Sequence, residues 1–522
     1  MGIPNHAKGT EIPVTISSGA MTNKTQFLSL VTALALFAPA VPNPRIPLAP
    51  PADYDFATED ALARQIDFSR PNQAQLNGIF AKRRARVLRA IPDGAMLIYS
   101  VETTQPRRLE FQVAASDNHD FIYLTGLSGL ASVESALLLV PGPTVAEDWA
   151  VLYSSAEDLA QVRRSTGIAD VRPFARLEQE LSVAMTDHRD WRITQLRRWP
   201  LPAALAQRWG NSKKTLYLNY PRFFRLGMPE PSRLATFDRF RRFSPEMDLK
   251  DAADILDPIR MYHDALALAS IRRAVWITGE GIKEGFRAAK AGRTESQIME
   301  IIDFVYRFHG ADLGFPTEVM RYPPGGPKPR AEIPEGFIMY QTRSSGDTLQ
   351  AGDLVHTDTG AEFNFFSADI QRNIAVDGTL TPKQRETYEL ALKIQKTVID
   401  SIRPGVTWWQ LHRIAERMMK EAGGYDQYYR YGIGHFIGME VHDEGDYTQP
   451  LQAGMALTIE QGIFPPNGPH AAFEDDIIVT PTGHEWVSRS IPIEIAEIEA
   501  LAKEPSNLAA FLSQPTGSRR RP

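Results

Sequence analysis

Short apolar runs alternate with helical patterns in the first half of the chain. Residues 83–90 have helical spacing, and the runs 95–99, 136–140 and 149–153 are compact and apolar. Runs of this length, bounded by Gly and Pro, are typical of buried strands. Because helices alternate with buried strands, the pattern predicts an α/β domain whose sheet is covered by helices, and we place this domain at residues 75–245.

Longer helical patterns follow in the second half. One begins at Asp264, and two later helices carry recognisable start signals. Thr381 and Gln384 have capping-box spacing with a proline between them at the first helical position, and Thr407 and Gln410 repeat the spacing. These signals predict helices that start at about residues 382 and 408.

A change in composition separates the two halves. Residues 230–257 are rich in Arg, Phe, Pro and Asp, which we interpret as a domain junction. The second domain is therefore expected at residues 255–500, followed by a flexible tail at 501–522.

The N-terminal region resembles an export signal. Residues 27–38 are an apolar run that is too short to span a membrane comfortably, and residues 38–40 have the small-x-small pattern that signal peptidase recognises. Met21 lies just upstream and is an alternative start. We expect residues 1–50 to hold a signal peptide, at about 21–40, and a Pro-rich linker, and the protein to be periplasmic or secreted. A buried N-terminal helix in a cytoplasmic protein is the alternative.

Composition restricts the chemistry that the chain can perform. Apolar residues make up 43% and charged residues 23%, and the net charge of -6 shows no basic excess, so a nucleic-acid partner is not expected. We also expect no membrane association after signal removal. Since the chain has no cysteine, any metal must be held by carboxylates and imidazoles. Such ligands suit manganese, cobalt, iron or zinc.

Two aspartates mark the first candidate site. Asp358 ends one apolar strand pattern, and Asp369 opens another eleven residues later. Carboxylates at the ends of paired strands can converge on one point. Aspartates also flank strands as turn formers, so these two residues alone leave the question open.

Three further residues strengthen the candidate site. His435 lies between glycines, where the backbone can pass close to a site, although a structural histidine is the alternative. Glu460 and Glu474 each lie in or beside an apolar strand. Acidic residues are rarely buried unless they are paired or bound to metal, so these carboxylates require a cation. Four carboxylates and one histidine could hold two divalent ions.

The order and context of these residues resemble the pita-bread metallopeptidase family, which includes methionine aminopeptidase, aminopeptidase P and prolidase. The segments TDTG, SADIQR, GIGHFIGMEVHD, LTIEQG and FEDDIIVT are similar to blocks of that family and follow in the same order. Residues 404–421 and 116–126 resemble segments of aminopeptidase P (Xaa-Pro aminopeptidase) and prolidase. The resemblance covers residues 75–500.

The resemblance implies a fold of the α/β (α+β) class. A creatinase-like N-terminal domain would lean over the site and restrict substrates to short peptides. The C-terminal pita-bread domain would be a curved antiparallel sheet backed by helices, with the metals in its hollow. Members of the family commonly form dimers or tetramers, so we expect a homo-dimer or homo-tetramer.

The resemblance also implies an activity. It predicts a metal-dependent exopeptidase that removes the N-terminal residue from peptides with proline in second position. The nucleophile would be a hydroxide that bridges two divalent metal ions, manganese being expected and cobalt, zinc or iron being alternatives. Metal binding lowers the pKa of water from about 15.7 toward about 7. The implied ligands are Asp358, Asp369, His435, Glu460 and Glu474.

Two of the implied roles are catalytic. Glu460 would also carry the proton from water to the leaving nitrogen, as a general acid and base. His442 would hydrogen-bond the substrate or the tetrahedral intermediate. A structural histidine bonded to backbone carbonyls is the alternative for His442.

Three positions depart from the family pattern. Gln341 and Tyr431 stand where the family has histidines, and Ala472 stands where it has an arginine. Gln341 and Tyr431 are the expected substrate-binding residues, because both can donate a hydrogen bond to a developing oxyanion. Neither titrates near neutral pH. Two alternatives therefore stay open: a prolidase-like dipeptide or organophosphate hydrolase, and a weakened or silent protein that binds peptides.

Overall fold

The structure is a computed structural model. It describes residues 49–100, 118–185, 204–205, 208–209, 214–220, 232–324, 347–429, 432–465 and 468–513. The predicted signal peptide and most of the Pro-rich linker lie outside the described residues. Among the residues that the structure describes, no helix is long and apolar enough to cross a bilayer. The oligomeric state stays a prediction.

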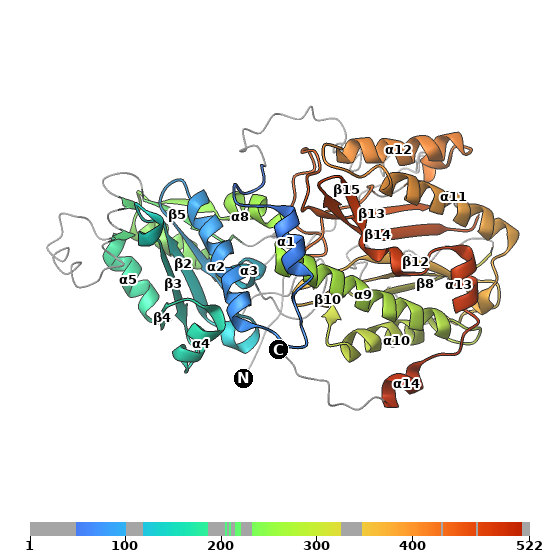
Figure 1. Cartoon of the computed structure of the whole chain (residues 1–522), viewed down its shortest axis with the longest axis horizontal. Helices are drawn as coiled ribbons and strands as arrows, with labels where there is room; N and C mark the ends of the chain where they lie inside the picture. The colour runs from blue at the N-terminus through green and yellow to red at the C-terminus, as the bar shows by residue number, and fades with distance from the viewer. Residues whose placement is uncertain are drawn as a thin grey trace, which may run out of the picture. The chain divides into compact units, whose positions relative to one another are not determined.

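The first half of the chain forms a six-stranded mixed sheet (Figure 1). Its strands, in spatial order, are β4 (Asp170–Pro173), β3 (Trp149–Ser154), β2 (Ser135–Val140), β1 (Ala95–Tyr99), β5 (Thr215–Leu218) and β6 (Asp248–Asp251). β1, β2 and β3 lie where the three apolar runs predicted strands. β2 runs antiparallel to both of its neighbours, and the outer pairs are parallel.

Helices cover both faces of this sheet. They are α2 (Gln73–Ala90), α3 (His119–Thr125), α4 (Leu159–Thr166), α5 (Arg176–Met185) and α7 (Ser232–Phe243). α5 and α7 contribute apolar side chains to one core cluster with Leu97 and Leu138, while α2 lies on the opposite face (Figure 1). Residues 230–257, which we interpreted as a junction, contain α7, the edge strand β6 and the start of α8 (Ala253–Arg260).

The second half forms a sheet in which every neighbouring pair of strands is antiparallel. The order is β13 (Ala456–Ile463), β14 (Ala471–Thr480), β12 (Ile370–Ala375), β9 (Leu354–Thr359) and β8 (Glu318–Tyr322), and β15 (Gly483–Trp486) also pairs with β14. A small sheet joins β11 (Phe366–Ser367), β10 (Ala361–Phe363) and β7 (Asp312–Leu313). The predicted antiparallel architecture is confirmed.

Three helices of this half, α9 (Ala265–Ala288), α11 (Pro382–Ile399) and α12 (Trp408–Glu421), start where their sequence signals place them. The other helices here are α10 (Glu295–Phe308), α13 (Ile495–Leu501) and α14 (Leu508–Ser513), and α1 (Phe56–Ala63) packs on α9. Both predicted capping boxes are formed, at Thr381 and at Thr407. Asp264 caps α9 by accepting a hydrogen bond from the backbone N–H of Ala267. α9 and α10 lie side by side, as do α11 and α12 (Figure 1).

One face of the antiparallel sheet is covered by helices. Gln395 of α11 donates a hydrogen bond to Asp475, and the ring of Tyr388 packs on Phe473 at 4.8 Å between centroids. Side chains alternate between the two faces of a strand. Glu474, which lies between Phe473 and Asp475, therefore points to the opposite face, and that face carries the candidate site.

Candidate metal centre

Strand register places five polar side chains in one row across the sheet, and the row starts at Glu318 of β8, which pairs with Asp358. Asp358 pairs with Gln371, Gln371 with Glu474, and Glu474 with Glu460. Residues that lie directly opposite each other on neighbouring strands point to the same face, at intervals of about 4.8 Å. The row therefore brings four carboxylates and one amide together, although Asp358 and Glu460 are 102 positions apart in the sequence.

Asp369 and His435 complete the site from the ends of loops. Asp369 immediately precedes β12, and its carboxylate Oδ2 lies 3.5 Å from Nε2 of His435. Nε2 of His435 also lies 3.4 Å from Oε1 of Glu474. Asp369, His435 and Glu474 are all buried. The five residues predicted as ligands thus lie close together.

A glycine allows the loop of His435 to approach the sheet. Gly434 has a φ of 148°, and a Cβ at this position would lie 2.1 Å from the carbonyl oxygen of Thr458. The loop is fixed to β13 because the backbone N–H of Thr458 donates to the carbonyl of His435, and that of Glu460 donates to Ile433. Any larger residue at Gly434 would push His435 away from the carboxylates.

The donor atoms are arranged as a metal site requires. Three overlapping sets each bring their ligand atoms within 4.8 Å of one another: Asp358, Asp369 and Glu474; His435, Glu460 and Glu474; and Asp369, His435 and His442. Nδ1 of His435 lies 3.0 Å from the carbonyl oxygen of Phe436, which can only accept a hydrogen bond, so Nδ1 donates and Nε2 is left for a metal. Oδ1 of Asp369 is buried and accepts no hydrogen bond from any described residue. Carboxylate and imidazole donors with unused acceptor capacity fit divalent cations.

The pKa shifts reflect a surplus of buried negative charge. Burial, reinforced by the charge of Glu474, raises the pKa of Glu460 well above its usual range. Burial and the charge of Asp369 raise the pKa of Glu474 as well. Burial alone would lower the pKa of His435, but hydrogen bonds to Asp369 and Glu474 outweigh it and hold that pKa well above its usual value. Bound cations would compensate this surplus of charge.

His442 lies beside the site. Its ring centroid is 4.1 Å from that of His435, and its side chain is exposed, unlike that of His435. A tight turn joins the two histidines, because the backbone N–H of Asp443 donates to the carbonyl of Phe436 and that of Met439 donates to Oδ2 of Asp443. His442 can therefore reach a molecule that is bound at the carboxylates.

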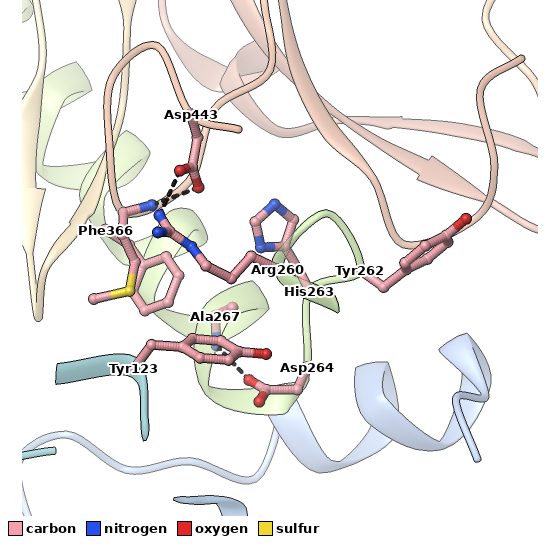
Figure 2. A pocket seen from close by; sticks show the side chains of 9 residues that line it. Tyr123, Arg260, Tyr262, His263, Asp264, Ala267, Phe366 and Asp443 are labelled. Carbon is pink, nitrogen blue, oxygen red and sulfur yellow. Dashed lines mark hydrogen bonds and ion pairs between the residues drawn. The ribbon is translucent and has the colours of Figure 1, made fainter. Parts of the chain in front are cut away.

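Buried charges connect this turn to the first half of the chain. Arg260 donates from Nη1 to Asp120 of α3 at 2.7 Å and from Nη2 to Asp443 at 2.6 Å. Figure 2 shows the guanidinium of Arg260 in contact with Asp443, and both side chains line a pocket together with Tyr123 and Asp264. Nδ1 of His119 lies 2.6 Å from Oε1 of Glu440, within the same turn. Residues of the first half thus fix the segment that carries His442.

Comparison with known proteins identifies the fold and the family. The profile of metallopeptidase family M24 matches residues 269–481, which include all five predicted ligands. Residues 269–481 therefore form an M24 metallopeptidase domain. This domain makes the protein a hydrolase, and the predicted resemblance to the pita-bread metallopeptidases is confirmed.

Relatives of the M24 domain are named for proline-directed cleavage. The Xaa-Pro dipeptidase of Pyrococcus furiosus is 27% identical over 270 residues, which are 51% of this chain and 74% of that protein. The Xaa-Pro aminopeptidase of Haemophilus influenzae is 28% identical over 284 residues, 49% of this chain and 64% of that protein.

Solved structures share the two-domain fold. Proline aminopeptidase P II from Yersinia pestis aligns with a TM-score of 0.63 at 22% identity, over 82% of this chain and 99% of that one. Aminopeptidase P from Escherichia coli with the inhibitor Pro-Leu aligns with a TM-score of 0.62 at 21% identity, over 84% of this chain and 99% of that one. The likeness extends over both halves of this chain, beyond the M24 domain.

The three positions that depart from the family pattern are only partly described by the structure. Gln341 and Tyr431 lie outside the described residues, so their placement stays a prediction. Ala472 is buried, and its carbonyl oxygen accepts a hydrogen bond from the amide of Asn373.

Sequence reasoning missed three residues that support the M24 site. Gln371 shares the ligand row, and Oδ2 of Asp476 accepts a hydrogen bond from the backbone N–H of Asp369 at 3.1 Å. Each lies two positions after a predicted ligand, so the two-residue period of a strand could have revealed both. Arg260 carries no such signal, since its partners are 140 and 183 positions away.

Proposed function

We propose that this protein is an exopeptidase that removes the N-terminal residue from short peptides with proline in second position, and that it uses two divalent ions, manganese being the first candidate. The observation that carries the proposal is the convergence of the five ligand residues in three overlapping ligand sets. The names of the proline-directed relatives support the substrate class.

The residues of the site would have two roles in the reaction, which are metal binding and proton transfer. Asp358, Asp369, His435, Glu460 and Glu474 would hold the ions. When bound, such ions lower the pKa of water and polarise the scissile carbonyl. Glu460 takes the proton from the attacking water and passes it to the leaving nitrogen, which is general acid–base catalysis.

His442 is placed to act on the substrate. Because the ring is exposed and lies beside His435, it can donate a hydrogen bond to the carbonyl oxygen of the scissile bond. Such a donor favours the charge that develops on this oxygen in the transition state.

The test is a comparison of tripeptides that differ only in the second residue. Purified protein loaded with Mn²⁺ should release the first residue of an Xaa-Pro-Xaa tripeptide and leave the Xaa-Ala-Xaa tripeptide intact. Glu460→Gln should bring turnover close to background, because the amide cannot carry the proton. Cleavage of both tripeptides at equal rates would refute the proline specificity, and cleavage of Xaa-Pro dipeptides alone would favour a prolidase.

A further inference from the structure

Gln371 occupies the centre of the ligand row. It lies on β12 between Asp358 on β9 and Glu474 on β14. Its side-chain nitrogen Nε2 donates a hydrogen bond to Oε2 of Glu474 at 2.7 Å and lies 3.4 Å from Oδ2 of Asp358. One neutral amide thus contacts two of the residues that would hold the metal.

We propose that Gln371 is a positioning residue for the metal centre, which holds one oxygen of Glu474 and one of Asp358 so that their other oxygens are available to cations. The inference rests on the proposed metal-dependent function. It assigns a role to a residue outside the ligand set, in the form of hydrogen bonds that orient the ligands.

The two oxygens of Glu474 have different neighbours. Oε2 accepts from Gln371, while Oε1 lies 3.4 Å from Nε2 of His435. Glu474 is 1% exposed, so water cannot easily take over the role of Gln371. Without the amide donor, Oε2 of Glu474 would lose its hydrogen bond, and the carboxylate could rotate so that Oε1 no longer faces His435.

The chemistry of the amide suits the centre of an acidic row. A carboxylate at this position would add a like charge opposite two others, which is destabilising between paired strands. An apolar side chain would leave buried oxygens without this donor, which destabilises the folded protein. A glutamine is neutral and has two N–H bonds to donate.

Nearby residues of β12 cannot replace Gln371. Its neighbour Arg372 points to the other face, where it pairs with Asp475. Asn373 shares the face of Gln371 but donates to the carbonyl oxygen of Ala472. Removing the Gln371 amide should therefore act on the metal ligands directly.

The first test is calorimetric titration of metal-free protein with Mn²⁺. Gln371→Met keeps the size of the side chain and removes the donors, so Mn²⁺ affinity should fall about 10- to 100-fold, as for other residues that orient metal ligands. Gln395→Met is the matched control: it removes a buried glutamine that donates to Asp475 at 2.9 Å on the opposite face. This control should lose stability and keep its Mn²⁺ affinity.

The outcomes separate this inference from the proposed function. If Gln371→Met binds Mn²⁺ within two-fold of the wild-type protein, the positioning role is refuted and the metal site stands. If the wild-type protein takes up no Mn²⁺, both the inference and the proposed function fail.

A second variant covers the case in which Gln371→Met does not fold. Gln371→Asn keeps a neutral amide but shortens the side chain by one methylene, so this variant should also bind Mn²⁺ less tightly than the wild-type protein. Mn²⁺ affinity within two-fold of the wild-type value in this variant would overturn the inference.

Discussion

Arg260 is the buried cation that joins Asp120 of α3 to Asp443 in the histidine turn, which is residues 435–443. Its side chain is 2% exposed, and those of its partners Asp120 and Asp443 are 6% and 5% exposed. Arg260→Met keeps much of the side-chain volume but leaves two buried carboxylates without their cation. Removing one partner of a buried ion pair costs about 3–5 kcal/mol. This is a large part of a typical folding free energy of about 5–15 kcal/mol.

The assay is urea unfolding followed by circular dichroism, with Arg242→Met as the matched control. Arg242 pairs with Asp238 at 3.4 Å, but the two side chains are 80% and 53% exposed. Exposed pairs contribute at most about 1 kcal/mol, so the control should unfold close to the wild-type midpoint. Arg260→Met should unfold at a clearly lower urea concentration.

A triple variant distinguishes uncompensated charge from lost packing. Arg260→Met combined with Asp120→Asn and Asp443→Asn removes all three charges, so it should recover much of the lost stability. If Arg260→Met costs no more than Arg242→Met, or if the triple variant is less stable than the single one, the reasoning about buried charge is wrong.

Three further predictions concern the site. Asp369→Ala should abolish metal uptake and turnover with an unchanged circular dichroism spectrum, and retained turnover would exclude metal-dependent hydrolysis. Gly438→Ala should destabilise the protein by about 1–3 kcal/mol in urea unfolding, because the new Cβ would lie 2.0 Å from Oδ2 of Asp443; an unchanged midpoint would show that the turn adapts. The rise in melting temperature that Mn²⁺ causes should be larger at about pH 8 than at about pH 5, and an equal rise at both would contradict the account.

The sign of this pH dependence follows from the raised pKa values at the site. A carboxyl group with a raised pKa, such as Glu460, makes metal-free folded protein bind more protons than unfolded protein, so its stability falls as pH rises above the ordinary value of 4.5. The raised pKa of His435 acts in the same direction as pH rises above 6.5. Metal ions favour the deprotonated ligands and therefore stabilise the protein most at high pH.

Local signals predicted much of the fold. The capping boxes at Thr381 and Thr407 located two helix starts, because the cap is a contact between residues three positions apart. The apolar runs located β1, β2 and β3. The five candidate ligands could be predicted because carboxylates within apolar strands require a partner, and because their order resembles that of a known family.

The features of the fold and site that were not predicted depend on contacts between residues that are far apart in the sequence. The position of Gln371 between Asp358 and Glu474 follows from strand register, which the sequence alone does not give. The contacts of Arg260 depend on how α3 and the histidine turn pack on α8. Residues 230–257 have the composition of a junction, yet the backbone of β6 completes the first sheet through hydrogen bonds that do not depend on composition.

The most direct test of the metal centre is a titration of metal-free protein with Mn²⁺ in which bound metal per chain and release of the first residue of Xaa-Pro-Xaa are measured together. We expect no turnover before metal is added and a maximum rate when two ions are bound per chain. Turnover that persists after chelation, or metal-free protein that binds no Mn²⁺, would contradict it.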